Sequence, residues 1–249
     1  MSVIKTKAKT VWRIFWECFK QAITPSVMYF VSSAVLMLVL ARMGDGESTE
    51  LDINMNSLVT WTIVCGIVSV AYNGLLMFSC GGSHYEMLVS GNMKRRSAMQ
   101  YGDELNISAY KIEKEYRPWK GFVMGGIISG AIIVSSILFG ANSQAIAAGE
   151  MNGALSAFVI IFDLLAGWII LPFQMAARMG ASVNFYLLSL FALIPIAVSG
   201  GLYIAGAYKR RSKRLREQEI AAKQALEAQA KPKKINYGGL PGTKPRKRR

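Results

Sequence analysis

Five stretches of the sequence are long, apolar and nearly free of charge. They cover residues 25–41, 57–80, 121–140, 154–173 and 184–208. Each has about the 20 residues that a helix needs to cross the roughly 30 Å hydrocarbon core of a bilayer. A helix satisfies its own backbone hydrogen bonds, which lipid cannot do. The pattern predicts an all-α, polytopic membrane protein with five apolar segments.

The residues before the first apolar segment include both aromatic and basic side chains. The apolar positions that recur at helical spacing are Val11, Trp12, Phe15, Trp16 and Phe19. This spacing is typical of an amphipathic helix in the membrane interface, with a helix packed on other protein as the alternative. We expect this helix to end at Thr24-Pro25, because the residue before a proline disfavours the α conformation. A signal peptide is disfavoured, because its charged region would be too long.

Basic residues are concentrated in three of the segments that flank the apolar stretches. Residues 1–24 hold five, residues 81–120 hold seven and residues 209–249 hold fifteen, whereas residues 43–56 hold four acids and no base. Lys and Arg near span ends accumulate on the cytoplasmic side. We therefore expect a multi-pass protein of the cell membrane with its N-terminus and C-terminal tail in the cytoplasm.

Five full crossings cannot place both termini on the same side. Four full crossings and one re-entrant segment misplace only two basic residues, whereas five crossings misplace at least twelve. We favour residues 154–173 as the incomplete crossing, since Asp163, Trp168 and Pro172 make this segment the least compatible with lipid. Four full spans or five remain the alternatives.

These patterns divide the chain into five regions. They are an amphipathic interfacial helix (1–24), a first transmembrane hairpin (25–80), a cytoplasmic loop (81–120), a second transmembrane region (121–208) and a basic cytoplasmic tail that is helical and then disordered (209–249).

Composition agrees with this division and localises the charge. The chain has 249 residues, 52% of them hydrophobic, and a net charge of +14; its mean hydropathy is +0.30. The tail carries 15 of the basic residues against three acids. Anionic lipid attracts each nearby base by about 1 kcal/mol, and RNA phosphates attract bases in a salt-dependent way. The residues assigned to an anionic partner or lipid are Lys209, Arg210, Arg211, Lys213, Arg214, Arg216, Arg246, Lys247, Arg248 and Arg249.

Asp163 is the one charged residue inside the five apolar segments. Acids at bilayer depth cost a few kcal/mol and often belong to ion or proton pathways. The structural alternative is an aspartate that bonds neighbouring helices together, through Asn73, Tyr72 or Ser199.

Small residues follow four-residue spacing in the third apolar segment. Gly121, Gly125 and Ser129 mark one face, and Gly126 and Gly130 mark the adjacent one. Such faces allow close approach of helix backbones. We expect them to pack within the chain, with oligomerisation as the alternative.

The sequence from Cys80 to Glu86 holds the single histidine of the chain, His84. No second Cys or His pair completes a metal site there. Its glycines suggest a turn, followed by a helix start with Ser83 as N-cap and Glu86 as capping-box partner. No phosphate loop, dinucleotide fingerprint, zinc-protease helix or nucleophile elbow occurs, so we expect neither an enzyme nor a cofactor.

Three hypotheses of function remain. The first is a non-enzymatic scaffold or accessory subunit whose loop and tail bind a protein partner at the cytoplasmic face. The second is a small permease or channel-like component that uses Asp163. The third follows from the tail, which resembles the basic tails of some membrane-protein insertases and would imply contact with the ribosome or RNA. The intramembrane arginine expected of that family is absent from the five apolar segments.

Overall fold

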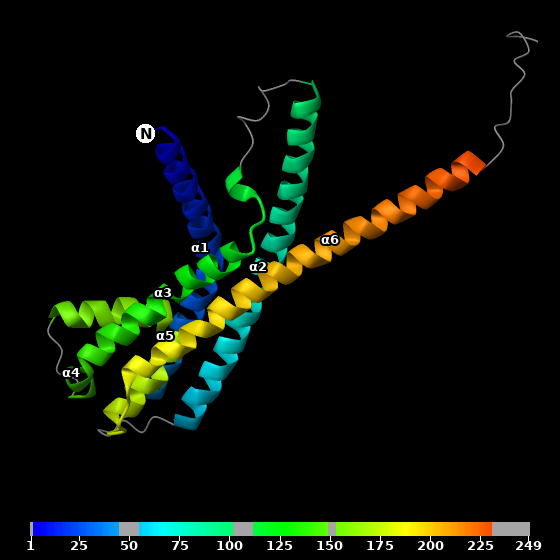
Figure 1. Cartoon of the computed structure of the whole chain (residues 1–249). Coiled ribbons are helices and arrows are strands. Elements are labelled where there is room, and N and C mark those ends of the chain that lie inside the picture. The colour runs from blue at the N-terminus through cyan, green and yellow to red at the C-terminus, as the bar shows by residue number, and fades with distance from the viewer. Residues whose placement is uncertain (1, 45–54, 102–111, 149–152, 231–249) are drawn as a thin grey trace, which may run out of the picture. The chain divides into compact units, whose positions relative to one another are not determined.

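The computed structural model describes residues 2–44, 55–101, 112–148 and 153–230 (Figure 1). Within these ranges the regular structure is entirely helical. The elements are α1 (Ser2–Gly44), α2 (Met55–Tyr101), η2 (Ile112–Lys114), α3 (Trp119–Ala141), α4 (Ser143–Ala148), α5 (Gly153–Arg178), η3 (Phe185–Ala192) and α6 (Leu193–Ala230). Five helical segments are long and apolar enough to cross a membrane. Four of them contain one of the apolar stretches completely, and the fifth contains all of the last stretch except residue 184.

Helix α1 does not end at Thr24-Pro25, so that prediction is wrong. The helix runs through Pro25 for 43 residues. A proline in a helix removes one backbone donor and bends the helix. Helix α1 packs against α2, α3 and α5, and it has buried residues on both sides of Pro25, among them Cys18, Ala22 and Tyr29. The aromatic N-terminal segment is therefore continuous with the first apolar segment.

Helix α2 likewise runs through the predicted turn. Ser83 and Glu86 lie inside α2, so the predicted N-cap and capping box are wrong. Gly81 instead lies at the point where α2 crosses α6. A Cβ atom at Gly81 would lie 2.0 Å from the carbonyl oxygen of Tyr203, and one at Gly206 would lie 1.9 Å from that of Phe78. Only glycine allows α2 and α6 to cross so closely.

Helix α3 lies antiparallel to the η3–α6 segment along its whole length. The Ser129 hydroxyl donates to the Ala192 carbonyl at 2.8 Å, and the Ser136 hydroxyl donates to the Phe185 carbonyl at 2.7 Å. Lys120 and Phe185 therefore mark opposite ends of the bundle. We call these the Lys120 end and the Phe185 end.

Helix α5 is sharply bent. The Gln174 amide donates to the Asp163 carboxylate at 2.7 Å, although eleven residues of straight helix would separate the two positions by about 16 Å. Pro172 lies between them and has no backbone donor, and proline is the usual cause of a sharp kink. All seven residues from 166 to 172 are buried, whereas a straight surface helix would expose one face. Residues 166–172 thus form the tip of a helical hairpin.

Both ends of this hairpin lie at the Phe185 end. On the N-terminal side, α4 follows directly after α3 and packs against α5. On the C-terminal side, a Cβ atom at Gly140 would meet the ring of Tyr186 at 2.6 Å, and the Phe139 and Phe185 rings lie 6.1 Å apart. The chain therefore enters and leaves α5 at the same end of the bundle.

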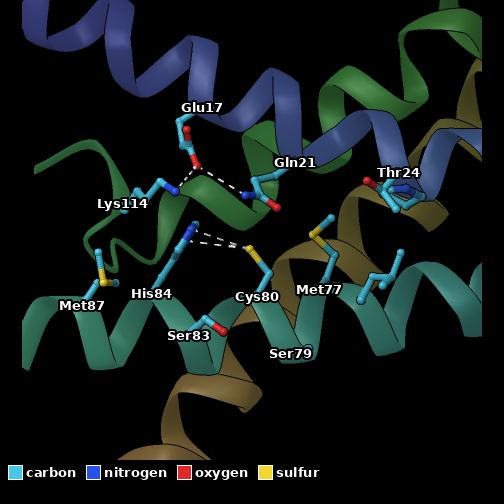
Figure 2. A pocket seen from close by; sticks show the side chains of 12 residues that line it. Glu17, Gln21, Thr24, Met77, Ser79, Cys80, Ser83, His84, Met87 and Lys114 are labelled. Atoms are coloured by element: carbon cyan, nitrogen blue, oxygen red, sulfur yellow. Dashed lines mark hydrogen bonds and ion pairs between the residues drawn. The ribbon is translucent and has the colours of Figure 1, made fainter. Parts of the chain in front are cut away.

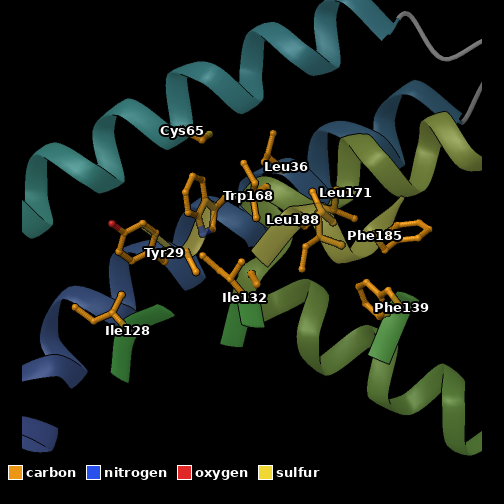
Figure 3. Packing of buried hydrophobic residues seen from close by; sticks show 14 of the residues in the cluster. Tyr29, Leu36, Cys65, Ile128, Ile132, Phe139, Trp168, Leu171, Phe185 and Leu188 are labelled. Carbon is orange, nitrogen blue, oxygen red and sulfur yellow. The ribbon is translucent and has the colours of Figure 1, made fainter. Parts of the chain in front are cut away.

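The tip of α5 lies in the centre of the core (Figure 3). The Trp168 ring lies 5.2 Å from the ring of Tyr29 in α1, and a Cβ atom at Gly66 of α2 would lie 3.4 Å from it. Gly66 lies near the middle of the second apolar stretch, and Ser33, whose hydroxyl accepts a hydrogen bond from the Trp168 N–H, lies at the middle of the first. The hairpin consequently reaches only halfway along the bundle.

Residues 211–230 belong to a second compact unit, which begins at Arg211. They form the remainder of α6 and are exposed along nearly all of their length. Apolar side chains occur among the charged ones, and Leu215, Ile220 and Leu226 are exposed.

Candidate functional site

Polar side chains from three helices meet in the middle of the bundle. Asn73 of α2 donates to the Ser199 hydroxyl of α6 at 3.0 Å and to the Tyr29 hydroxyl of α1 at 3.4 Å. The hydroxyls of Ser32 and Ser69 share a hydrogen bond of 2.6 Å. In the described part of the chain, every fully buried side-chain nitrogen or oxygen has a partner. This pairing locks α1, α2 and α6 together.

The tip of α5 joins the same region through its backbone. The Trp168 N–H donates to the Ser33 hydroxyl at 3.0 Å, and that hydroxyl donates to the Tyr29 carbonyl at 2.9 Å. Where a sharp bend interrupts the helical hydrogen bonds, a side chain from a neighbouring helix can pair with the backbone. Ser33 therefore fixes the depth to which the hairpin enters the bundle.

Asp163 is buried, with 5% of its surface exposed. Its partner Gln174 belongs to the same helix, on the other arm of the hairpin. The expected partners Asn73 and Ser199 bond to each other instead. Asp163 thus holds the two arms of α5 together.

A second group of polar side chains lines a cleft of about 410 Å³ at the Lys120 end, shown in Figure 2. We call it the polar cleft. Its wall from α1 includes Glu17 and Gln21, its wall from α2 includes Cys80 and His84, and Lys114 of η2 lies at its edge. The Lys114 ammonium lies 4.0 Å from the Glu17 carboxylate.

His84 links the polar cleft to α6. Its ring Nδ1 lies 2.8 Å from the Tyr203 hydroxyl, and the Cys80 sulfur lies 3.8 Å from both ring nitrogens. Cys80 and His84 together supply two side chains of the types that bind metal ions. The residues that the structure describes include no group of three or more His, Cys, Asp and Glu able to hold a metal ion.

The segment before α3 is fastened over this region by Lys120. The Lys120 side chain is fully buried, and its ammonium donates to the Glu115 carbonyl at 2.7 Å and to the Glu113 carbonyl. The backbone of Tyr116 donates to the His84 carbonyl at 3.0 Å, and its ring stacks on that of Tyr203 at 5.3 Å. A buried ammonium needs such acceptors, because an unpaired buried charge is costly.

The small residues of α3 have two different environments. A Cβ atom at Gly121 would lie 2.7 Å from the Cβ of Tyr203, and one at Gly125 would lie 2.7 Å from the Cα of Ile196. These two glycines, together with Ser129, pack against the fifth apolar segment, residues 184–208. A Cβ atom at Gly126 or Gly130 would meet no other atom within 4 Å. That second face is open.

The basic residues assigned to partners fall into three groups. Arg210 is paired with Glu86, and the Lys209 ammonium lies 5.2 Å from the centre of the Phe78 ring. Residues 211, 213 and 216 are exposed and Arg214 is half-buried. Residues 246–249 lie outside the described residues.

Three residues of these sites had no signal in the sequence. Gln174, Tyr203 and Lys120 occur at ends of apolar stretches or inside them, where uncharged polar and flanking basic residues are common. Their partners lie 11, 119 and 5–7 positions away along the chain. A histidine next to an otherwise apolar stretch was the one indication of the polar cleft.

No protein-family model, no curated protein and no solved structure matches this chain.

Proposed function

We propose that the chain is a multi-pass cell-membrane protein with four full crossings and a re-entrant α5. The observation that carries this proposal is the bend that returns α5 to the Phe185 end. Helices α1, α2, α3 and α6 then make an even number of crossings. The N-terminal segment, residues 81–120 and the tail all lie in the cytoplasm, as their basic residues require.

Aromatic side chains support this placement. Trp16, Trp119 and Tyr208 are exposed near the Lys120 end, and Trp61 and Tyr186 are exposed near the opposite end. Trp and Tyr collect at the two interfaces of a bilayer. Between Lys120 and Ala141, α3 provides about 30 Å of helix, which matches the hydrocarbon thickness.

The protein acts, in this proposal, as a non-enzymatic scaffold or accessory subunit that binds a protein partner in the cytoplasm. Up to Arg210, the described charged side chains lie at the Lys120 end, apart from Asp163 and Arg178. The polar groups of the bundle centre bond to one another and not to a pathway. Exposed Leu215 and Leu226 on a charged helix offer apolar contacts to a partner.

Thiol labelling from outside the cell tests the topology. In a chain whose three cysteines are replaced by serine, we introduce Ala148→Cys or Ala181→Cys. Both positions are exposed, and Gly180 is avoided because its φ of +84° closes the end of α5. We expect both thiols to react with an impermeant maleimide. Reaction at 148 alone would make α5 an ordinary span and overturn the topology.

Photocrosslinking in intact cells tests partner binding. A photoreactive amino acid replaces Leu215 or, as the matched control, the similarly exposed apolar residue Ile67 of α2. We expect a discrete protein adduct from position 215 that disappears in a Leu226→Asp background, and lipid adducts alone from position 67. Lipid adducts alone at both positions would contradict a partner-binding role.

A permease is the second candidate, favoured by the buried Asp163 on a re-entrant hairpin. Broken helices and buried acids at bilayer depth recur in transporters. Asp163→Asn keeps a hydrogen-bond acceptor for Gln174 but removes the ionisable group. Loss of solute flux into vesicles, with normal folding of the variant, would favour the permease over the scaffold.

A further inference from the structure

The helical hairpin of α5 reaches only halfway through the bundle. The space beyond its tip is therefore not filled by α5, and we call this space the other half of its slot. On the side of the Lys120 end, below the tip of α5, the structure has a groove of about 510 Å³ between α1 and α3. Its α1 wall extends from Phe19 to Phe30, its α3 wall from Ile127 to Ala131, and Leu165 of α5 closes it near the tip. We call it the half-slot groove.

The half-slot groove has an apolar surface. The hydroxyl of its Ser26 already donates to the Ala22 carbonyl at 2.8 Å, and the hydroxyl of its Tyr29 already accepts from Asn73. The remaining lining side chains are Ala, Val, Ile, Leu and Phe. Phe19, Ile23 and Val27 are between 36% and 54% exposed. The groove therefore suits a hydrocarbon ligand and not a polar one.

Basic residues occur on the same helix, close in sequence to Phe19, the first residue that lines the groove. Arg13 and Lys20 are exposed on α1, and the exposed Trp16 lies between them. In the proposed topology this part of α1 lies at the headgroup level of the cytoplasmic leaflet. Cations at that level attract anionic headgroups by about 1 kcal/mol each.

We propose that the half-slot groove holds one acyl chain of an anionic phospholipid from the cytoplasmic leaflet, with the headgroup at Arg13 and Lys20. This inference rests on the proposed membrane topology. An apolar groove that opens sideways into a bilayer is filled by hydrocarbon, because empty space forfeits the dispersion contacts of its lining. The acyl chain then fills the part of the bundle, toward the Lys120 end, that α5 does not reach.

Photoactivatable lipids test this proposal on the full-length protein. Vesicles contain either phosphatidylglycerol or phosphatidylcholine with a diazirine in the acyl chain. The protein is extracted with excess lipid-free detergent to remove loosely held lipid and is then irradiated. We expect the surviving adducts to map to residues 19–30 and 127–131, and to be several-fold more abundant with phosphatidylglycerol.

Two substitutions on α3 make a matched pair. Ala131→Phe fills the groove, whereas Ile133→Phe changes an exposed position that does not line it. We expect Ala131→Phe to lower adduct formation on α1 several-fold and Ile133→Phe to leave it unchanged. Arg13→Gln with Lys20→Gln should abolish the preference for phosphatidylglycerol.

Three results would overturn the inference: adducts spread evenly over exposed faces, an equal effect of the two α3 substitutions, or occupation of the groove by a protein in crosslinks made in native membranes. The thiol labelling at positions 148 and 181 reports separately on topology. A re-entrant α5 without retained lipid would refute the lipid site alone.

Discussion

At the scale of single residues, glycine decides where helices can cross. A Cβ atom at Gly81 or Gly206 would meet a carbonyl oxygen of the facing helix at a distance that no Cβ atom tolerates. By contrast, a Cβ atom at Gly201 of the same helix α6 would meet nothing within 4 Å. The spacing of small residues in the sequence could not separate these two kinds of position, because both fit a packing pattern.

We expect Gly206→Ala to destabilise the protein by about 2 kcal/mol, the usual range for overpacking a tight contact being roughly 1–3 kcal/mol. The added methyl group would force α2 and α6 apart at Phe78. Thermal unfolding in detergent, followed by circular dichroism, measures the loss. Gly201→Ala is the control and should be neutral or slightly stabilising, since alanine favours the helix. Equal melting temperatures for the two variants would refute the crossing.

At the scale of the element, a hydrogen bond across the hairpin maintains the bend of α5. Asp163 and Gln174 are both buried, and the side chain of one bonds to that of the other. The sequence located the unusual segment through Asp163, Trp168 and Pro172. It could not show the bend itself, because a proline in a membrane helix is also compatible with a gentle kink.

We expect Gln174→Leu to destabilise α5 by about 1–3 kcal/mol, because it leaves a buried carboxyl group without its partner. Asp163→Leu combined with Gln174→Leu should recover part of that loss, since both polar groups are then gone. The control is Gln144→Leu, the same change at an exposed position. The measurement is again the melting temperature in detergent. Additive losses in the double variant would argue against the pair.

At the scale of the whole molecule, charged side chains are concentrated at one end of the bundle, and its middle is mainly apolar. The polar cleft and the buried Lys120 lie at one end, and the interior polar groups are paired. Fourteen of the 15 basic residues of the tail lie either in residues 209–216, which flank the last apolar stretch, or in residues 231–249, farther along the chain. We expect the first part to determine the orientation of the last span and the second to act in binding to anionic partners.

We expect deletion of residues 231–249 to leave topology unchanged, because the basic residues next to the last span determine its orientation. The deletion removes eight basic residues and should weaken binding to anionic vesicles most strongly at low salt. Flotation of the purified protein with vesicles over a range of salt concentrations measures this effect. Loss of ribosome co-sedimentation on the same deletion would favour the insertase-like hypothesis over the scaffold.

The sequence by itself determined that five apolar helical segments form, and that their flanking charges conflict with five full crossings. Hydropathy and charge are properties of consecutive residues, so a single chain displays them directly. Only the tertiary structure decided that α1 and α2 run through their predicted breaks, that α5 folds back on itself, and that a half-slot groove lies beneath its tip. These features depend on contacts such as Asn73 with Ser199, between residues 126 positions apart, which no local pattern encodes.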